Sequence, residues 1–252
     1  KTAELKMVNQ KEQLGNPEFK VILEKVDKAK HLNFYADSFQ GIKTGDDPRY
    51  RFSLWEVRDC SFWKPLQGTV KSTIDYGGVS DVIPWIDEGY YMSRRQGVSG
   101  WNKKGVSVSQ MSSLPASIHF GSIFDSNISA VVPKKEEYLD AIWAFCSSEE
   151  YNKSVRVIDQ ALAASNAAMA QVPFDIEKWQ KVAKEKYPNG LPKPYSDDPT
   201  QWLFHGHPIK TENPLQVALA RVLGYRWPAE SDTEMELAEE ARELIAAVKA
   251  FD

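Results

Sequence analysis

Residues 105–148, GVSVSQMSSLPASIHFGSIFDSNISAVVPKKEEYLDAIWAFCSS, decide the fold class of this chain. Short runs rich in β-branched residues are separated here by Gly, Ser, Asn and Pro, which is typical of short strands joined by turns. The runs are Gly105–Ser109, Ser117–Phe120 and Ile128–Val132. After Pro133, apolar residues return at helical spacing within Lys135–Ser147. Strands followed by helices predict an α+β fold with a small mixed or antiparallel sheet.

The same pattern extends from this stretch in both directions. Upstream, Tyr50–Val57 and Val82–Ile86 have the composition of strands. Downstream, apolar spacing predicts four further helices. They are Glu149–Ile158, Ile176–Tyr187 with Asp175 as its N-cap, Leu215–Leu223 ending at Gly224, and Glu234–Phe251.

The chain divides into four predicted segments. Residues 1–30 are polar and helix-prone, with Val21 and Ile22 in a thin apolar stripe, so we expect a lead-in helix. Residues 31–175 form the main α+β domain. Residues 176–214 hold one helix and then a linker whose Pro and Gly content forbids a long helix or central strand. Residues 215–252 form a helical tail.

Composition bounds the class of protein. The 252 residues are 42% hydrophobic, 26% charged and 12% aromatic, which is ordinary for a globular domain with a sizeable core. No apolar run reaches the roughly 18 residues of a membrane span, and no secretory leader is present, so we expect a cytoplasmic protein without a membrane partner. The chain begins with Lys1, which we interpret as the start of an excised or processed piece. Cys60 and Cys146 lack metal-ligand spacing and are expected to be buried free thiols.

Charge is distributed unevenly. The formal net charge is −4, which speaks against a simple nucleic-acid binder. Residues 1–110 carry +3, residues 111–224 carry −2 and residues 225–252 carry −5. A basic first part with an acidic tail fits a modular protein with one phosphate-facing end, although many proteins without a nucleic-acid partner share it.

The segment Gly41–Arg51 contains the first candidate site. Its two glycines permit unusual backbone angles and could expose main-chain amides, and Lys43, Arg49 and Arg51 flank them. Amides and cations together grip phosphate oxygens, and the Thr44 hydroxyl can join them. Two alternatives stay open: a solvated turn, because Thr44–Pro48 has turn chemistry throughout, or a metal-dependent nuclease site formed by Lys43, Asp46 and Asp47.

Residues 90–104 contain the second candidate site. Arg, Gln and Asn are the side chains that pair bidentately with guanine or adenine edges, and Lys suits phosphate. The base-reading candidates are Arg94, Arg95, Gln96 and Asn102, and the phosphate candidates are Lys103 and Lys104. The alternative is a solvated hairpin tip with Trp101 packed at its base.

Most enzyme signatures are missing from the sequence. It has no Gly-x-Gly-x-x-Gly or Walker-type loop and no Gly-x-Ser-x-Gly elbow. His205 and His207 form the only histidine pair, without a cysteine or carboxylate cluster beside it, so a solvated loop is favoured over a metal site. We therefore expect no catalytic residue and no metal in this chain.

The order of motifs resembles a known family. Gly41-Ile-Lys-Thr-Gly-Asp-Asp-Pro-Arg-Tyr50, followed by Trp55-Glu-Val57, resembles the Gly-Leu-x-Thr-Gly-Asp-Asn-x-Arg-Phe…Glu-Val segment. That segment opens the target-recognition domain of large adenine-N6 DNA methyltransferases of the type IIG and phage-exclusion kind. Further similar pieces follow in the family's order across about residues 35–180. They are Tyr76–Gly78, Val82–Trp85, Trp101–Ser109, Phe124-Asp125, Val131–Pro133, Ala141–Ser148 and Val172–Phe174. The layout is also similar to the recognition domains of type I specificity subunits.

The resemblance implies that this chain binds DNA and does not itself catalyse a reaction. Residues 31–175 would recognise a double-stranded DNA sequence, with a catalytic methyltransferase domain of the same protein as partner. The family's Asn/Asp-Pro-Pro-Tyr/Phe motif and its S-adenosylmethionine loop are absent here, so the chain is expected not to be an enzyme by itself. S-adenosylmethionine is expected only for the full-length protein. The rivals are the small nuclease described above and a protein-interaction module that binds no DNA.

Overall fold

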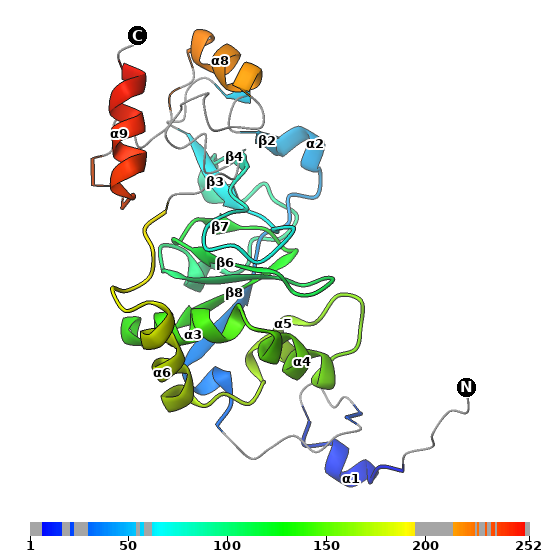
Figure 1. Ribbon diagram of the computed structural model, residues 1–252. Helices are drawn as coiled ribbons and strands as arrows, with labels where there is room; N and C mark the ends of the chain where they lie inside the picture. Colours follow the sequence, from blue (N-terminus) through cyan, green and yellow to red (C-terminus); the bar gives the residue numbers. More distant parts are fainter. Residues whose placement is uncertain are drawn as a thin grey trace, which may run out of the picture.

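The computed structural model describes residues 7–16, 21–22, 30–53, 56–57, 62–194, 214–224, 226, 230, 233–234 and 236–249. Two small sheets and several helices form it, which confirms the predicted α+β class (Figure 1). The strands are β1 (Ala36–Gln40), β2 (Phe52–Ser53), β3 (Trp63–Gln67), β4 (Asp81–Pro84), β5 (Gly105–Ser109), β6 (Ala116–His119), β7 (Ile123–Phe124) and β8 (Ile128–Pro133). The α-helices are α1 (Gln10–Gln13), α2 (Asp47–Tyr50), α3 (Leu139–Cys146), α4 (Glu149–Ile158), α5 (Asn166–Ala170), α6 (Ile176–Lys186), α8 (Pro214–Val222) and α9 (Glu239–Val248).

The first sheet has the order β1-β8-β5-β6, and every neighbouring pair is antiparallel. Successive residues of a strand point to opposite faces. In β8, Val131 belongs to the large core cluster under the helices, whereas Ile128, Ala130 and Val132 pack in a separate cluster around Phe124. Both faces of this sheet are therefore buried, which accounts for the apolar run Ala130–Val132.

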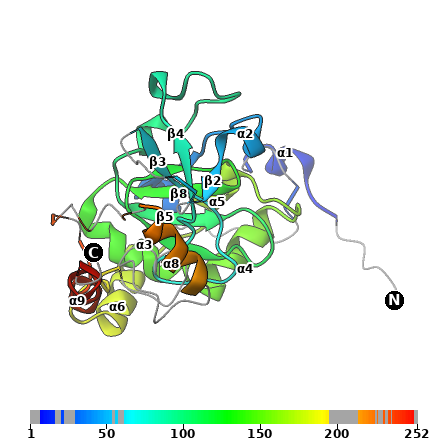
Figure 2. The ribbon, with the colours of Figure 1, turned by 90° about the horizontal axis from the view of Figure 1, so that it is seen from above.

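The second sheet has the order β2-β4-β3-β7 and mixes antiparallel pairs with one parallel pair, β3 with β7. Its core is small and consists of Ile42, Leu66, Ile83, Met92 and Ile123. In Figure 1 this sheet lies on the side of the first sheet that faces away from α3 to α6. Figure 2 shows α2 beside the second sheet, with the chain beyond β4 projecting from the body.

The helices α3 to α6 cover the other face of the first sheet. Every residue of α3 except Asp140 is buried, because the helix lies between the sheet and α6. Trp143 donates its indole hydrogen to the Tyr187 hydroxyl at 2.8 Å, and Phe145 packs on Trp179 with ring centroids 5.0 Å apart. Asp175 accepts hydrogen bonds from the amides of Glu177 and Lys178, which confirms the predicted N-cap of α6.

Several element predictions are confirmed and others are wrong. β5 and α4 have the predicted bounds, and α8 is followed by Gly224 in the left-handed region at φ 96°. The strand predicted from Tyr50 is wrong at its start, because Asp46 and Pro48 begin a helical turn that includes Tyr50. The strands β1 and β3 and the helix α5 were not predicted.

Two other expectations concerned the N-terminal segment and the cysteines. The described part of residues 1–30 has helical conformation only in α1, and Ile22 is buried in the chain's own large core. Cys146 is a buried free thiol, as predicted, and burial raises its pKa. Cys60, the His205 and His207 pair and most of the predicted linker lie outside the described residues.

Within the ranges that the structure describes, no helix combines the length and the apolar composition needed to cross a bilayer.

Candidate nucleic-acid interface

The first candidate loop is held against the turn between β7 and β8. Ile42 forms an isolated parallel bridge with Asp125, and its amide donates to the Phe124 carbonyl at 2.8 Å. Gly41 permits this approach, because a Cβ at that position would lie 2.0 Å from the Phe124 oxygen and 2.4 Å from the Asp125 oxygen. The glycine is therefore needed for close backbone contact, which is a different reason from the conformational freedom expected from the sequence.

The two candidate loops are joined by backbone pairing. Lys43 and Arg94 form an isolated antiparallel bridge and exchange two hydrogen bonds, each 3.0 Å long. Ser93 adds two contacts, from its amide to the Thr44 carbonyl at 3.2 Å and from its hydroxyl to the Lys43 carbonyl at 3.0 Å. Gly45 lies at φ 86° and leaves no room for a side chain beside Ser93. The structure thus joins the part of the second candidate site around Arg94 to the first candidate loop.

Side chains reinforce this junction. The rings of Tyr50 and Tyr91 lie 4.7 Å apart, and the Gln96 amide donates to the Gly41 carbonyl at 2.8 Å. The Tyr91 hydroxyl donates to the carbonyl of Pro84. Burial, with a smaller contribution from Tyr50, raises the pKa of Tyr91 to about 12, so the hydroxyl keeps the proton that it donates.

The bridge places Lys43 and Arg94, two residues of like charge, at directly opposed backbone positions. Side chains at opposed positions of an antiparallel pair project to the same face, and like charges there destabilise the pair. Both Lys43 and Arg94 are exposed, and among the described residues no ion pair joins either of them to a carboxylate. Arg49 is also exposed and lies over the ring of Tyr50, with its guanidinium carbon 5.2 Å from the centroid. The arrangement is suited to an external anion that would relieve the repulsion.

Arg51 has a different environment from the other candidate cations. Its Nε donates to the carboxylate of Asp81, and its Nη1 donates to Asp125 Oδ2 at 2.6 Å. Burial alone would lower its pKa, but the hydrogen bond and charge of Asp81, together with Asp125 and Asp47, raise it above the ordinary value. The guanidinium is already held by the protein.

Thr44 is also occupied within the loop. It is buried, its hydroxyl donates to the Asp47 carboxylate, and it accepts from the Asp46 amide at 3.3 Å. The amides of Ile42 and Lys43 are used in the bridges described above. The expectation of open main-chain amides is therefore wrong for Ile42, Lys43 and Asp46. A direct contact from Thr44 to DNA stays a prediction.

Arg95 is fixed by its own loop. Its Nε donates to the Glu88 carbonyl at 2.9 Å, and its guanidinium carbon lies 4.6 Å from the Tyr90 ring centroid and 5.2 Å from that of Trp101. Tyr90 itself is 71% exposed. In this geometry Arg95 supports the loop, and bidentate pairing with a base would require it to leave Glu88.

Asn102, Lys103 and Lys104 precede β5 and are exposed. Asn102 has a left-handed backbone at φ 58°, and its backbone N–H donates to the Gly121 carbonyl at 2.9 Å. Lys104 Nζ lies 2.7 Å from a carboxylate oxygen of Glu236, near the start of α9. Hydrogen bonds and ion pairs between described residues do not join these three positions to the segment 41–45. The predicted site is thus only partly brought together.

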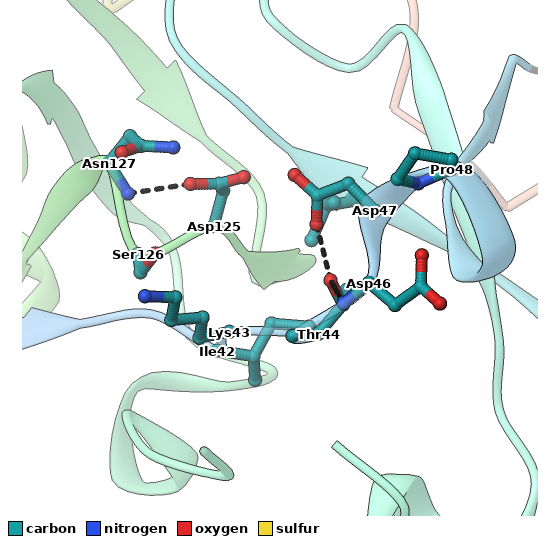
Figure 3. Close-up of a pocket in the computed structure, with 11 residues that line it drawn as sticks. Ile42, Lys43, Thr44, Asp46, Asp47, Pro48, Asp125, Ser126 and Asn127 are labelled. Carbon is teal, nitrogen blue, oxygen red and sulfur yellow. Dashed lines mark hydrogen bonds between the residues drawn. The ribbon is translucent and has the colours of Figure 1, made fainter. Parts of the chain in front are cut away.

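A cavity of about 440 Å³ lies beneath the first loop (Figure 3). The side chains of Asp47 and Asp125 extend into it from opposite sides, whereas Asp46 points away. Two carboxylates in the cavity would repel a phosphate, so the bridge between Lys43 and Arg94 is the better anion site. The complete lining is Ile42, Lys43, Thr44, Gly45, Asp46, Asp47, Pro48, Leu66, Asp125, Ser126 and Asn127.

The nuclease alternative required Lys43, Asp46 and Asp47 to converge on a metal ion. Asp47 instead accepts the Thr44 hydroxyl, and Asp46 occupies the N-cap position of α2. In the described ranges, no group of three or more His, Cys, Asp or Glu side chains is placed to hold a metal. The loop instead forms a turn in which Thr44 contacts Asp47, and α2 follows it directly.

Sequence reasoning missed the groups that organise the site. Asp81 and Asp125, the carboxylates that hold Arg51, lie 30 and 74 residues away from it in the chain. Ser93 is likewise remote in sequence from Lys43, and Tyr91 from Tyr50. No local pattern identifies such contacts, although Phe124-Asp125 had been noted for its place in the order of motifs.

No protein-family model and no curated protein matches the sequence. A solved structure with a similar trace is the HsdS subunit from Thermoanaerobacter tengcongensis, at a TM-score of 0.38 and 9% sequence identity. The similarity covers 90% of this chain and 44% of that subunit, so the chain spans less than half of its length. At that TM-score the similarity carries no argument about what this chain does.

Proposed function

We propose that this chain is a double-stranded DNA recognition module of an S-adenosylmethionine-dependent adenine-N6 DNA methyltransferase or restriction–modification protein. Support comes from the ordered motifs between residues 35 and 180 and from the geometry of the two loops. The methyl-transfer residues would belong to a catalytic domain of the same protein. No contact to S-adenosylmethionine is assigned to this chain, because the family's binding loop is absent from the sequence.

The bridge between Lys43 and Arg94 is the observation that carries the proposal. It holds two exposed cations side by side on backbone that is fixed by paired hydrogen bonds, so little ordering is needed when an anion binds. Neighbouring phosphates of a DNA strand supply that anion, and such contacts fix register on the duplex. Arg49 extends the same loop and would add a further phosphate contact.

Base reading is assigned to side chains with free polar edges. Asn102 is exposed at the turn before β5, next to the phosphate candidate Lys103, and Gln96 keeps its side-chain carbonyl oxygen after its side-chain NH2 group has bonded to Gly41. Arg94 could serve in phosphate contact or in base reading, because its guanidinium can bind a phosphate or a guanine edge. A catalytic domain of the same protein would then extrude the adenine, whose N6 is out of reach in stacked DNA.

A salt-dependent binding titration tests the proposal. Fluorescence anisotropy of a labelled random duplex is measured with the wild-type chain and with Lys43→Gln plus Arg94→Gln, between about 50 mM and about 200 mM salt. Each phosphate contact contributes about 0.9 to the slope of log affinity against log salt, so loss of both is expected to reduce the slope by about 2. A matched control is Lys181→Gln plus Lys184→Gln, which removes the same charge from the exposed side of α6.

The control is expected to keep the wild-type slope. Wild-type binding that is insensitive to salt, or a slope that the control lowers as much as the loop variant does, would contradict the proposal. The finer claim of adenine methylation is tested in the full-length protein, by transfer of labelled methyl groups to duplex DNA with and without the loop substitutions.

A further inference from the structure

Arg51 differs from the cations that we assign to DNA in what its guanidinium already touches. It reaches a carboxylate of the second sheet, Asp81 on β4, and a carboxylate of the β7–β8 turn, Asp125. Its side chain is 26% exposed, against 19% for Asp81 and 10% for Asp125. A partly buried charge of this kind is strongly tied to its partners, because removing one partner leaves an uncompensated charge.

The remaining edge of the guanidinium is also covered. Nη2 of Arg51 lies against Gly68, where an added Cβ would be only 3.1 Å away. Gly68 is buried, and its amide donates to the Gly78 carbonyl at 2.7 Å. These contacts occupy Nε, Nη1 and one side of Nη2, so they leave Arg51 less available to a phosphate than the exposed Lys43 and Arg94.

Asp125 connects Arg51 to the exposed part of the loop. Its Oδ1 accepts from the Asn127 amide at 2.6 Å, and its own amide donates to the Gln67 carbonyl at 2.9 Å. The same residue forms the parallel bridge with Ile42, the neighbour of Lys43. A change at Arg51 is therefore transmitted through Asp125 to the backbone that presents Lys43.

We infer that Arg51 is a positioning residue, which clamps Asp81 and Asp125 and thereby holds the segment 41–45 in its DNA-binding arrangement, and that it makes no phosphate contact. This inference rests on the proposed function of the loop. It replaces the sequence-based assignment of Arg51 to the DNA-contacting residues.

A phosphate-contacting role and a positioning role for Arg51 predict different effects of substitutions at Arg51 and Asp125. A phosphate-contacting arginine lowers the salt slope by about 1 when it is neutralised, whereas a positioning residue lowers affinity at an unchanged slope. Removing the negative charge of Asp125 would ordinarily favour DNA binding, but under our inference it releases the clamp and weakens binding. Arg51→Gln, Asp125→Asn and the double variant are therefore compared with wild type in the anisotropy assay, after circular dichroism has verified that each is folded.

We expect each single variant to lose about ten-fold in DNA affinity while the dependence of log affinity on log salt keeps the wild-type slope. The double variant should show no additional loss, because both substitutions break one network. Arg51→Lys keeps the charge but cannot span two carboxylates, so it should resemble Arg51→Gln. A slope reduced by about 1 in Arg51→Gln, or wild-type or tighter binding by Asp125→Asn, overturns the inference.

Hydrogen exchange of the free protein separates this inference from the proposed function. In Arg51→Gln and Asp125→Asn the amides of Ile42 and Lys43 should exchange faster than in wild type, while those of β5 and β8 keep their protection. Unchanged exchange at Ile42 and Lys43 overturns the positioning role. If wild type fails to bind DNA but exchange at the two amides still accelerates in the variants, the proposed function is wrong and the clamp stands.

Discussion

His119 on β6 carries the least compensated polar group in the described part of the chain. Its side chain is fully buried, neither ring nitrogen has a hydrogen-bond partner among the described residues, and its ring packs edge-on against Phe124 with centroids 5.5 Å apart. Burial lowers the pKa of His119 from 6.5 to about 4. The substitution His119→Phe would remove the titrating group and keep an aromatic ring in contact with Phe124.

The size of the effect follows from the pKa shift. Between pH 6.5 and about 4, the unfolded chain binds a proton at His119 that the folded chain excludes, so the free energy of unfolding falls as the pH falls. A shift of about 2.5 pKa units corresponds to about 3 kcal/mol once the pH is below both values, and roughly 2 kcal/mol is already lost at pH 4.5. At a pH well above 6.5 the imidazole is neutral in both states and contributes no pH dependence.

Urea denaturation at pH 7.5 and 4.5 measures this difference. Carboxylates also begin to titrate at the lower pH, so the informative quantity is the drop in wild-type stability minus the drop in His119→Phe. We expect roughly 2 kcal/mol for that quantity. Equal drops for wild type and His119→Phe would refute the reasoning, because they would mean that His119 finds a partner for its proton in the folded state.

Two further predictions concern the candidate interface. Gly41→Ala would place a Cβ 2.0 Å from the Phe124 carbonyl oxygen, so urea denaturation should show that the free energy of unfolding falls by about 1 to 3 kcal/mol. In the control Gly15→Ala the Cβ would meet only an ordinary 3.5 Å contact, so no comparable loss is expected. Equal stability of the two variants would argue against the close approach at Gly41. Glu236→Gln breaks an ion pair whose side chains are about half exposed, so stability should change by less than about 1 kcal/mol. DNA affinity should rise in the anisotropy assay because Lys104 is released, and a fall in affinity would count against a role for Lys104.

The fold class was predictable because its decisive elements carry strong local patterns. The run Ile128–Val132 is apolar because both faces of β8 are buried, and the apolar spacing before Cys146 matches a helix enclosed by the sheet and α6. β3 was missed because Pro65 lies within it, and a proline normally argues against a strand. β1 was missed because its residues are mostly polar and only partly buried, which gives no apolar alternation.

The candidate site was predictable in its residue types but not in its pairing. Composition indicated Lys43 and Arg94 separately, yet each lies outside any strand, and their bridge depends on Gly41 packing against the β7–β8 turn and on the contact between Tyr50 and Tyr91. Long-range contacts of this kind leave no periodicity in the sequence.

Because long-range contacts leave no local pattern, both Arg51 and Arg94 were assigned to DNA contact from the sequence alone. Both are arginines in basic, Gly-containing segments, and only carboxylates from distant parts of the chain distinguish them. Arg51 has two such partners and is held, whereas Arg94 faces another cation and has no carboxylate partner among the described residues. An arginine whose charge is already compensated stabilises its surroundings, and one placed opposite a like charge gains most from an external anion. On this physical criterion we assign Arg94 to the proposed DNA-contacting surface and Arg51 to the structure that would support it.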